Sequence, residues 1–143
     1  MVAASRGDDA PNRRPVGSSV SEGHHLEADD SGPAVFATCL QSLVDQTYSN
    51  LSLLIIDAGD GDPITDMVAS IAPDAFLHRI QGRPGFSAAA NQALTLVKDA
   101  TFLLFCRDDV ALEPKTVTAM VEEMFRSNAG IVTPKLVEWD DPR

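Results

Sequence analysis

Two short apolar runs dominate the pattern of the chain. Leu51–Ile56 and Thr101–Cys106 are apolar at nearly every position, which is typical of strands covered on both faces in a parallel sheet. After the break at Pro73, residues 75–80 predict a third, short extended element, and residues 131–133 predict a short fourth strand. We therefore expect two buried strands and two weaker ones.

Between these runs the apolar residues recur at the spacing of an α-helix. Helices are predicted over residues 35–46, 63–71, 86–98 and 113–127, the last ended by residues 128–130. Their core-facing residues are expected to be Phe36, Cys39, Leu40, Leu43, Val44, Leu94, Val97, Val117, Met120, Val121, Met124 and Phe125. Helices that alternate with short apolar strands predict an α/β fold, a three-layer sandwich with a mostly parallel sheet and right-handed crossovers.

The beginning of the chain has a different composition. Residues 1–33 hold one leucine and no isoleucine or aromatic residue, and they are rich in Ser, Gly, Asp, Arg and Pro. Such a segment cannot bury enough apolar surface to offset the entropy that is lost on ordering. We expect residues 1–34 to be a disordered tail and residues 35–143 to be one folded domain.

The charge of the chain argues against some classes of partner. The formal net charge is -10 and the pI is near 4.5, so nucleic acid or an anionic membrane surface would be repelled. No stretch approaches the ~20 consecutive apolar residues that span a bilayer. Cys39 and Cys106 lie far apart in apolar surroundings, which fits reduced thiols in a cytoplasmic protein.

Both buried strands run directly into acids. Asp57 ends the first strand, and Asp108 and Asp109 follow the second. Ligands of parallel α/β sheets bind beyond the carboxyl ends of the strands, and adjacent carboxylates favour a partner such as a divalent metal with a phosphate-bearing ligand. One acid alone is equally consistent with an Asx-turn or a helix cap, whereas acids at both strand ends favour a binding site.

Three blocks of the sequence resemble the family 2 glycosyltransferases, which have the A-type nucleotide-sugar fold. The blocks are Asp45–Asp57, Gly85–Asn91 and Phe102–Asp109, and the third is similar to the strand that carries the family's Asp-x-Asp motif. Residues 134–143 also resemble large actinobacterial members. The resemblance implies transfer of a sugar from a nucleotide-sugar donor to a hydroxyl of a glycan or lipid-linked acceptor. It also implies a cytoplasmic location, at the inner face of the membrane in full-length relatives.

The resemblance further implies a role for each motif residue. Asp57 would accept a hydrogen bond from the nucleotide base, Asp108 would lie near the ribose, and Asp109 would hold Mg²⁺ or Mn²⁺ on the diphosphate. Gly85 and Asn91 would line the donor pocket. From the residues alone, Gly85 could equally serve a turn with positive φ, and Asn91 could simply face solvent.

Arg107 stands where the family has the first acid of Asp-x-Asp. Alternation along an extended segment places residues 107 and 109 on the same side. Charges of +1 and +2 about 5 Å apart repel by roughly 6–7 kcal/mol at an effective dielectric constant of about 20. We therefore expect weakened or absent metal binding unless Arg107 turns away, and Arg107 could instead contact the diphosphate.

Two further departures concern the ends of the family's domain. No apolar strand precedes the helix at Phe36, and the chain stops where the family continues into the half that binds the acceptor and carries the catalytic base. We therefore expect a truncated chain, in which residues 35–143 are a partial nucleotide-sugar-binding domain without an assignable catalytic base. The alternative is a non-catalytic remnant or interaction module that at most binds nucleotide.

Overall fold

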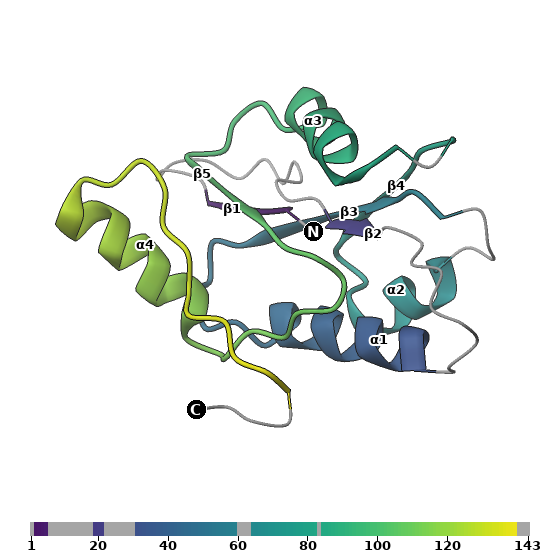
Figure 1. Ribbon diagram of the computed structural model, residues 1–143, viewed down its shortest axis with the longest axis horizontal. Helices are drawn as coiled ribbons and strands as arrows, with labels where there is room; N and C mark the ends of the chain where they lie inside the picture. Colours follow the sequence, from purple (N-terminus) through teal and green to yellow (C-terminus); the bar gives the residue numbers. More distant parts are fainter. Residues whose placement is uncertain (1, 6–18, 22–30, 60–63, 83, 140–143) are drawn as a thin grey trace.

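Figure 1 shows the computed structural model of the chain, which describes residues 2–5, 19–21, 31–59, 64–82 and 84–139. The strands in these residues are β1 (Val2–Ser5), β2 (Ser19–Ser21), β3 (Ser52–Asp57), β4 (Phe76–Arg79) and β5 (Phe102–Phe105). The helices are α1 (Ser31–Val44), α2 (Thr65–Ile71), α3 (Phe86–Leu96) and α4 (Thr116–Ser127). Helices and strands alternate from α1 onward, as the sequence predicts.

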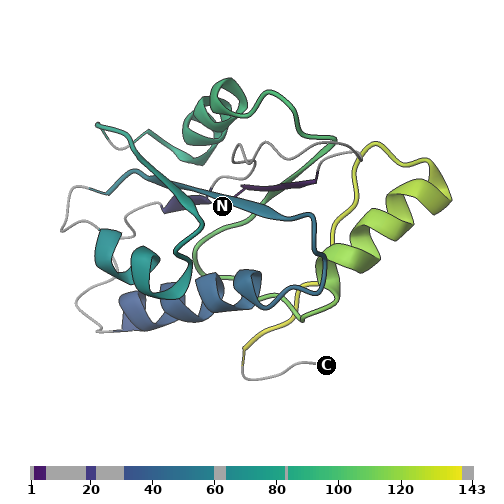
Figure 2. The same ribbon diagram turned by 180° about the vertical axis from the view of Figure 1, so that it is seen from behind.

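The central strand β3 separates two apolar cores. Leu53 and Ile55 pack with residues of α1 and α2, whereas Leu54 and Ile56 pack with Ala89 and other residues of α3. Figures 1 and 2 view the molecule from opposite sides, and both show α1 and α2 on one face of the sheet and α3 on the other. The predicted three-layer α/β sandwich is confirmed.

Most of the strands run in one direction. β2 and β4 pair parallel with β3. β1 pairs antiparallel with both β3 and β5, so β3 and β5 point the same way. The sheet is therefore mostly parallel, as predicted, and the carboxyl ends of β3 and β5 lie at the same edge.

The beginning of the chain contributes two strands that the sequence did not predict. Leu54 pairs with both Val2 and Phe76, and Ile55 pairs with both Ser19 and Leu77. β1 and β2 therefore share one edge of β3, opposite β4, and β1 fills the position between β3 and β5. The expected disordered tail over residues 1–34 does not hold for these strands, because pairing uses backbone groups that composition does not reveal. Residues 6–18 and 22–30 lie outside the described part of the chain.

The first helix begins earlier than predicted. α1 starts at Ser31 and includes Pro33 in its first turn, where backbone N–H groups have no partner within the helix and proline is tolerated. Phe36 and the predicted residues up to Leu43 are buried, whereas Val44 is exposed. The apolar pattern therefore located the core face of this helix correctly but not its first turn.

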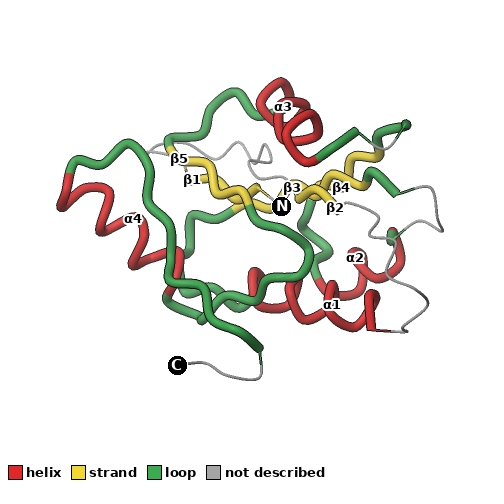
Figure 3. Tube along the Cα trace, viewed as in Figure 1, coloured by secondary structure: helices red, strands yellow, loops and turns green. Residues whose placement is uncertain are grey.

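Two other predictions about elements are wrong. Leu94 is 48% exposed, and Ala89 and Ala93 form the buried face of α3 instead, because these small side chains let the helix lie close to β3. Residues 131–133 form a loop (Figure 3), and Ile131 is 89% exposed. No strand in the described residues pairs with this segment, and a strand without a partner is not stable in water.

The last helix has the predicted end. Asn128 takes a left-handed conformation with φ of 52° directly after Ser127, a common way for a helix to stop. Val117 is buried as predicted, whereas Phe125 is exposed and packs its ring edge-to-face against Phe102 at 5.5 Å. Among the described residues, we find no helix with the length and apolar character that crossing a bilayer requires.

Candidate functional site

Two of the predicted segments lie at the carboxyl edge of the sheet. β3 ends at Asp57, and β5 is followed by Cys106 and then by the acidic loop, which we define as Arg107–Asp109. Because β3 and β5 are parallel, both segments leave the sheet at the same edge (Figure 1). This is the edge at which parallel α/β proteins bind ligands.

Asp57 is a buried acid whose two oxygens are both held. The residue as a whole is 4% exposed. Oδ1 accepts a hydrogen bond of 2.9 Å from the N–H of Gly59, and Oδ2 lies 3.6 Å from Nη1 of Arg79. The Asx-turn that the sequence left open is therefore present, and the ion pair offsets part of the cost of burying the charge.

Arg79 is a candidate site residue that the sequence did not reveal. The register of β4 places it opposite Asp57, and its Nη2 donates a hydrogen bond of 3.0 Å to the carbonyl oxygen of Gly59. The pairing of the third extended element with the first strand could have suggested this contact. The apolar pattern of these short segments does not fix their register, however, so the partner of Asp57 stayed hidden.

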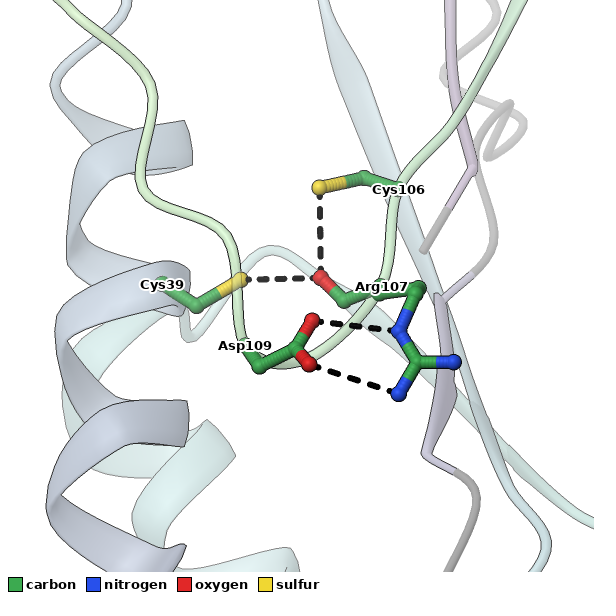
Figure 4. A network of polar contacts seen from close by, with 4 residues as sticks. All are labelled: Cys39, Cys106, Arg107 and Asp109. Atoms are coloured by element: carbon green, nitrogen blue, oxygen red, sulfur yellow. Dashed lines mark hydrogen bonds and ion pairs between the residues drawn. The ribbon is translucent and has the colours of Figure 1, made fainter. Parts of the chain in front are cut away.

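In the acidic loop, Arg107 forms an ion pair with Asp109. Nε donates to Oδ1 at 3.2 Å and Nη2 donates to Oδ2 at 3.3 Å (Figure 4), and both side chains are partly exposed. The guanidinium group thus faces the carboxylate as a two-pronged fork. An ion pair this close to solvent stabilises the fold by about 1 kcal/mol at most, so a stronger ligand could separate it.

The acidic loop as it lies does not fit a divalent metal. Both oxygens of Asp109 are engaged by Arg107. Within the described ranges, no group of three or more His, Cys, Asp or Glu side chains is placed to hold a metal ion. A cation would first have to displace a guanidinium group that repels it. Asp109 is therefore not poised as the metal ligand that the resemblance implied.

Asp108 differs from its neighbour in being half-buried. Its pKa is raised, chiefly because burial disfavours the charged form, and its own backbone N–H opposes this rise. The nearby Asp109 raises the pKa further, whereas Arg107 lowers it. A carboxyl group in such surroundings gains more than an exposed one from a ligand that donates a hydrogen bond to it.

The two remaining candidates lie directly before α3 and within it. Gly85 is the N-cap residue, with φ of -60°, and its carbonyl oxygen accepts from the N–H groups of Ala88 and Ala89. The positive φ belongs to Gly82, so the alternative of a positive-φ turn at Gly85 is wrong. Asn91 is exposed, and in the described part of the chain it makes no hydrogen bond to the other candidates.

The chain matches a known family. The family model described as Glycosyl transferase family 2 matches residues 31–143. The match begins at the first residue of α1 and includes Asp57, Arg79 and the acidic loop. Among curated proteins, none matches the chain.

Proposed function

This chain belongs to glycosyltransferase family 2, and we propose that it binds a nucleotide-sugar donor whose sugar is transferred to an acceptor hydroxyl. The observation that carries the proposal is the common edge of the sheet at which Asp57 and the acidic loop both lie. An acid with a fixed orientation and a partly exposed ion pair at one edge suit the two polar ends of a nucleoside diphosphate.

We assign the base to Asp57 and Arg79. The carboxylate of Asp57 can accept a hydrogen bond from an N–H group of the base. The partly exposed guanidinium of Arg79 beside it can donate a hydrogen bond to a carbonyl oxygen of the base. Uracil and guanine both carry a ring N–H next to a carbonyl group, whereas adenine does not. The pair therefore favours UDP or GDP over ADP.

We assign the diphosphate to Arg107. A guanidinium fork binds phosphate oxygens in the same geometry in which it binds a carboxylate, so Arg107 can exchange Asp109 for the donor. In this assignment Asp108 lies near the ribose, and Gly85 and Asn91 line the outer part of the pocket. A divalent metal is weakly bound or absent, because Arg107 supplies the positive charge that it would otherwise provide.

The proposal is tested by melting the protein with UDP, GDP or ADP, each in the presence of EDTA or Mn²⁺. UDP or GDP is expected to raise the melting temperature in EDTA, and ADP is not. A ligand at 100 times its dissociation constant stabilises the folded state by about 2.7 kcal/mol, which is readily measured. The absence of any shift would contradict donor binding and favour the non-catalytic module.

The role of Arg107 has a matched control. Arg126 makes the same two-pronged contact with Glu123 on α4, in an element that carries none of the candidate site residues. Arg107→Asp is expected to weaken metal-free binding of UDP or GDP by about 10- to 100-fold, which corresponds to the free energy of one hydrogen bond to a charged group. It is also expected to make binding depend on Mn²⁺. Arg126→Asp is expected to change neither property in calorimetry. If Arg107→Asp leaves both unchanged as well, the assignment fails.

A further inference from the structure

The two cysteines of the chain meet at the acidic loop. The thiol of Cys39, on α1, donates to the carbonyl oxygen of Arg107 at 3.3 Å, and the thiol of Cys106 donates to the same oxygen at 3.2 Å (Figure 4). The two sulfur atoms are therefore no farther apart than the sum of these distances. Residues that are distant in the sequence thus place two thiols beside one backbone atom.

Neither cysteine is in a disulfide and both are buried, but the two thiols are not equivalent. Cys39 is 0% exposed and Cys106 is 7% exposed. The contact between them, together with burial, raises the pKa of Cys39, and the hydrogen bond from Cys39 lowers the pKa of Cys106. Cys106 is therefore the more exposed residue of the two, and its thiol is the more easily deprotonated one.

Cys39 also contacts the first residue of the acidic loop. Its sulfur donates to the carbonyl oxygen of Arg107. Asp108 and Asp109 follow this contact directly in the sequence. A change in the chemistry of this sulfur consequently acts on the backbone that carries both acids.

We propose that Cys39 and Cys106 form a redox-active dithiol, a modification site that a small disulfide such as oxidised glutathione converts into an intramolecular disulfide. The Cys106 thiolate attacks one sulfur of the oxidant, whose S–S bond breaks and releases one small thiol. The Cys39 thiolate then attacks the sulfur of Cys106 and releases the second. The protein gives up two electrons and two protons, and the small disulfide becomes two thiols.

The disulfide changes the acidic loop. An S–S bond is about 2 Å long, so the two sulfurs must move toward each other. Neither sulfur then carries a proton to donate, and the carbonyl oxygen of Arg107 loses both of these hydrogen bonds. The loop that presents Arg107 and Asp109 is thereby displaced. We expect the displaced loop to bind the donor more weakly. That expectation rests on the proposed function, whereas formation of the disulfide does not.

The test uses the unaltered chain, incubated with oxidised or with reduced glutathione and digested without reduction. Mass spectrometry is expected to find, after oxidation, one linked pair of peptides containing Cys39 and Cys106, on a monomer that has lost two hydrogen atoms. Free thiols after oxidation, glutathione adducts alone, or links between chains would overturn the proposal. Because no variant is needed, a folding defect cannot confuse the result.

A second measurement tests the coupling to the donor. Oxidation is expected to weaken UDP or GDP binding at least about tenfold in calorimetry, and dithiothreitol is expected to restore it. An intact link with unchanged affinity would overturn the coupling. If the link forms but neither redox state binds any nucleotide, the proposed function fails while the dithiol stands.

Discussion

Asp57 ends β3 and Asp108 follows β5, a strand parallel to β3, yet the surroundings of the two acids affect their negative charges differently. Asp57 is almost fully buried but has Gly59 and Arg79 as partners for its two oxygens. Asp108 is half-buried next to another acid, and its pKa is raised chiefly by burial. The first carboxylate is therefore part of the folded framework, and the second costs folding free energy that a ligand could recover.

This difference predicts that Asp108→Asn stabilises the protein at pH 7. Because the pKa of Asp108 is raised in the folded state, the folded protein binds this proton more tightly than the unfolded chain. The free energy of unfolding therefore falls as the pH rises from the ordinary value of 3.8 through the raised one. Asparagine removes that loss, so the melting temperature is expected to rise at pH 7, with the gain shrinking as the pH approaches 3.8.

The matched control is Asp74→Asn, at an exposed position between α2 and β4. It is expected to leave the melting temperature nearly unchanged at both pH values. A lower melting temperature for Asp108→Asn than for the unaltered protein at pH 7 would show that its charge is compensated.

The sequence could identify the acids but not their partners. Asp57, Asp108 and Asp109 were predictable because each follows an apolar run, a pattern that is visible within ten residues. Arg79 reaches Asp57 only through the register of β4, and Cys39 reaches Arg107 only through the packing of α1 on the sheet. Contacts between distant segments depend on the folded arrangement, which local patterns do not contain.

At the scale of elements, the end of α1 is joined to the start of α4 by polar contacts. Nε2 of Gln46 donates to the carbonyl oxygens of Ser42 and Glu113, and its Oε1 accepts from the N–H of Val117. The hydroxyl of Ser42 accepts in turn from the N–H of Leu112. These contacts hold the segment between the acidic loop and α4 against the first helix.

We expect Gln46→Ala to lower the free energy of unfolding by about 2–3 kcal/mol, since it removes three hydrogen bonds worth about 1 kcal/mol each. Gln41→Ala is the matched control in α1, because the exposed side chain of Gln41 donates one hydrogen bond, to Asp45, and the loss of that bond should cost less than about 0.5 kcal/mol. Denaturant unfolding measures both values. Equal losses for the two variants would mean that Gln46 does not join the elements.

Element type was more predictable than element orientation. The order of helices and strands from α1 to α4 follows from the apolar spacing, whereas the buried face of α3 does not. There Ala89 and Ala93 are buried and Leu94 is exposed, because close approach of the helix to β3 favours small side chains. The predicted strand at residues 131–133 fails for a similar reason, since a strand requires a neighbour as well as a suitable sequence.

For the molecule as a whole, continuity of the sheet depends on β1. Ala3 pairs with Leu53 of β3 on one side and with Leu104 of β5 on the other. The family match begins at residue 31, so the strand that joins the two halves of the sheet lies outside it. The composition of this segment predicts disorder because it is poor in large apolar residues. The pairing of β1 with its two neighbours is not visible in that composition.

Ala3→Pro tests whether β1 holds this position. Proline removes the N–H that a central strand donates to one of its neighbours, so we expect the free energy of unfolding to fall by about 2 kcal/mol or more. Ala3→Val keeps the N–H and suits a strand, and it is expected to cost less. Denaturant unfolding that gives the same stability for both variants would contradict the placement of β1 between β3 and β5.

The place of β1 also has a consequence during synthesis. It is the first of the described elements to leave the ribosome, yet its partner β5 is made about 100 residues later, so its pairing closes a long loop. Roughly 50 residues separate β3 from β5, and at about 5–20 residues per second their synthesis takes several seconds. Throughout that time the first strand can be held on one side only, and the strand made earliest is the last to gain both of its neighbours.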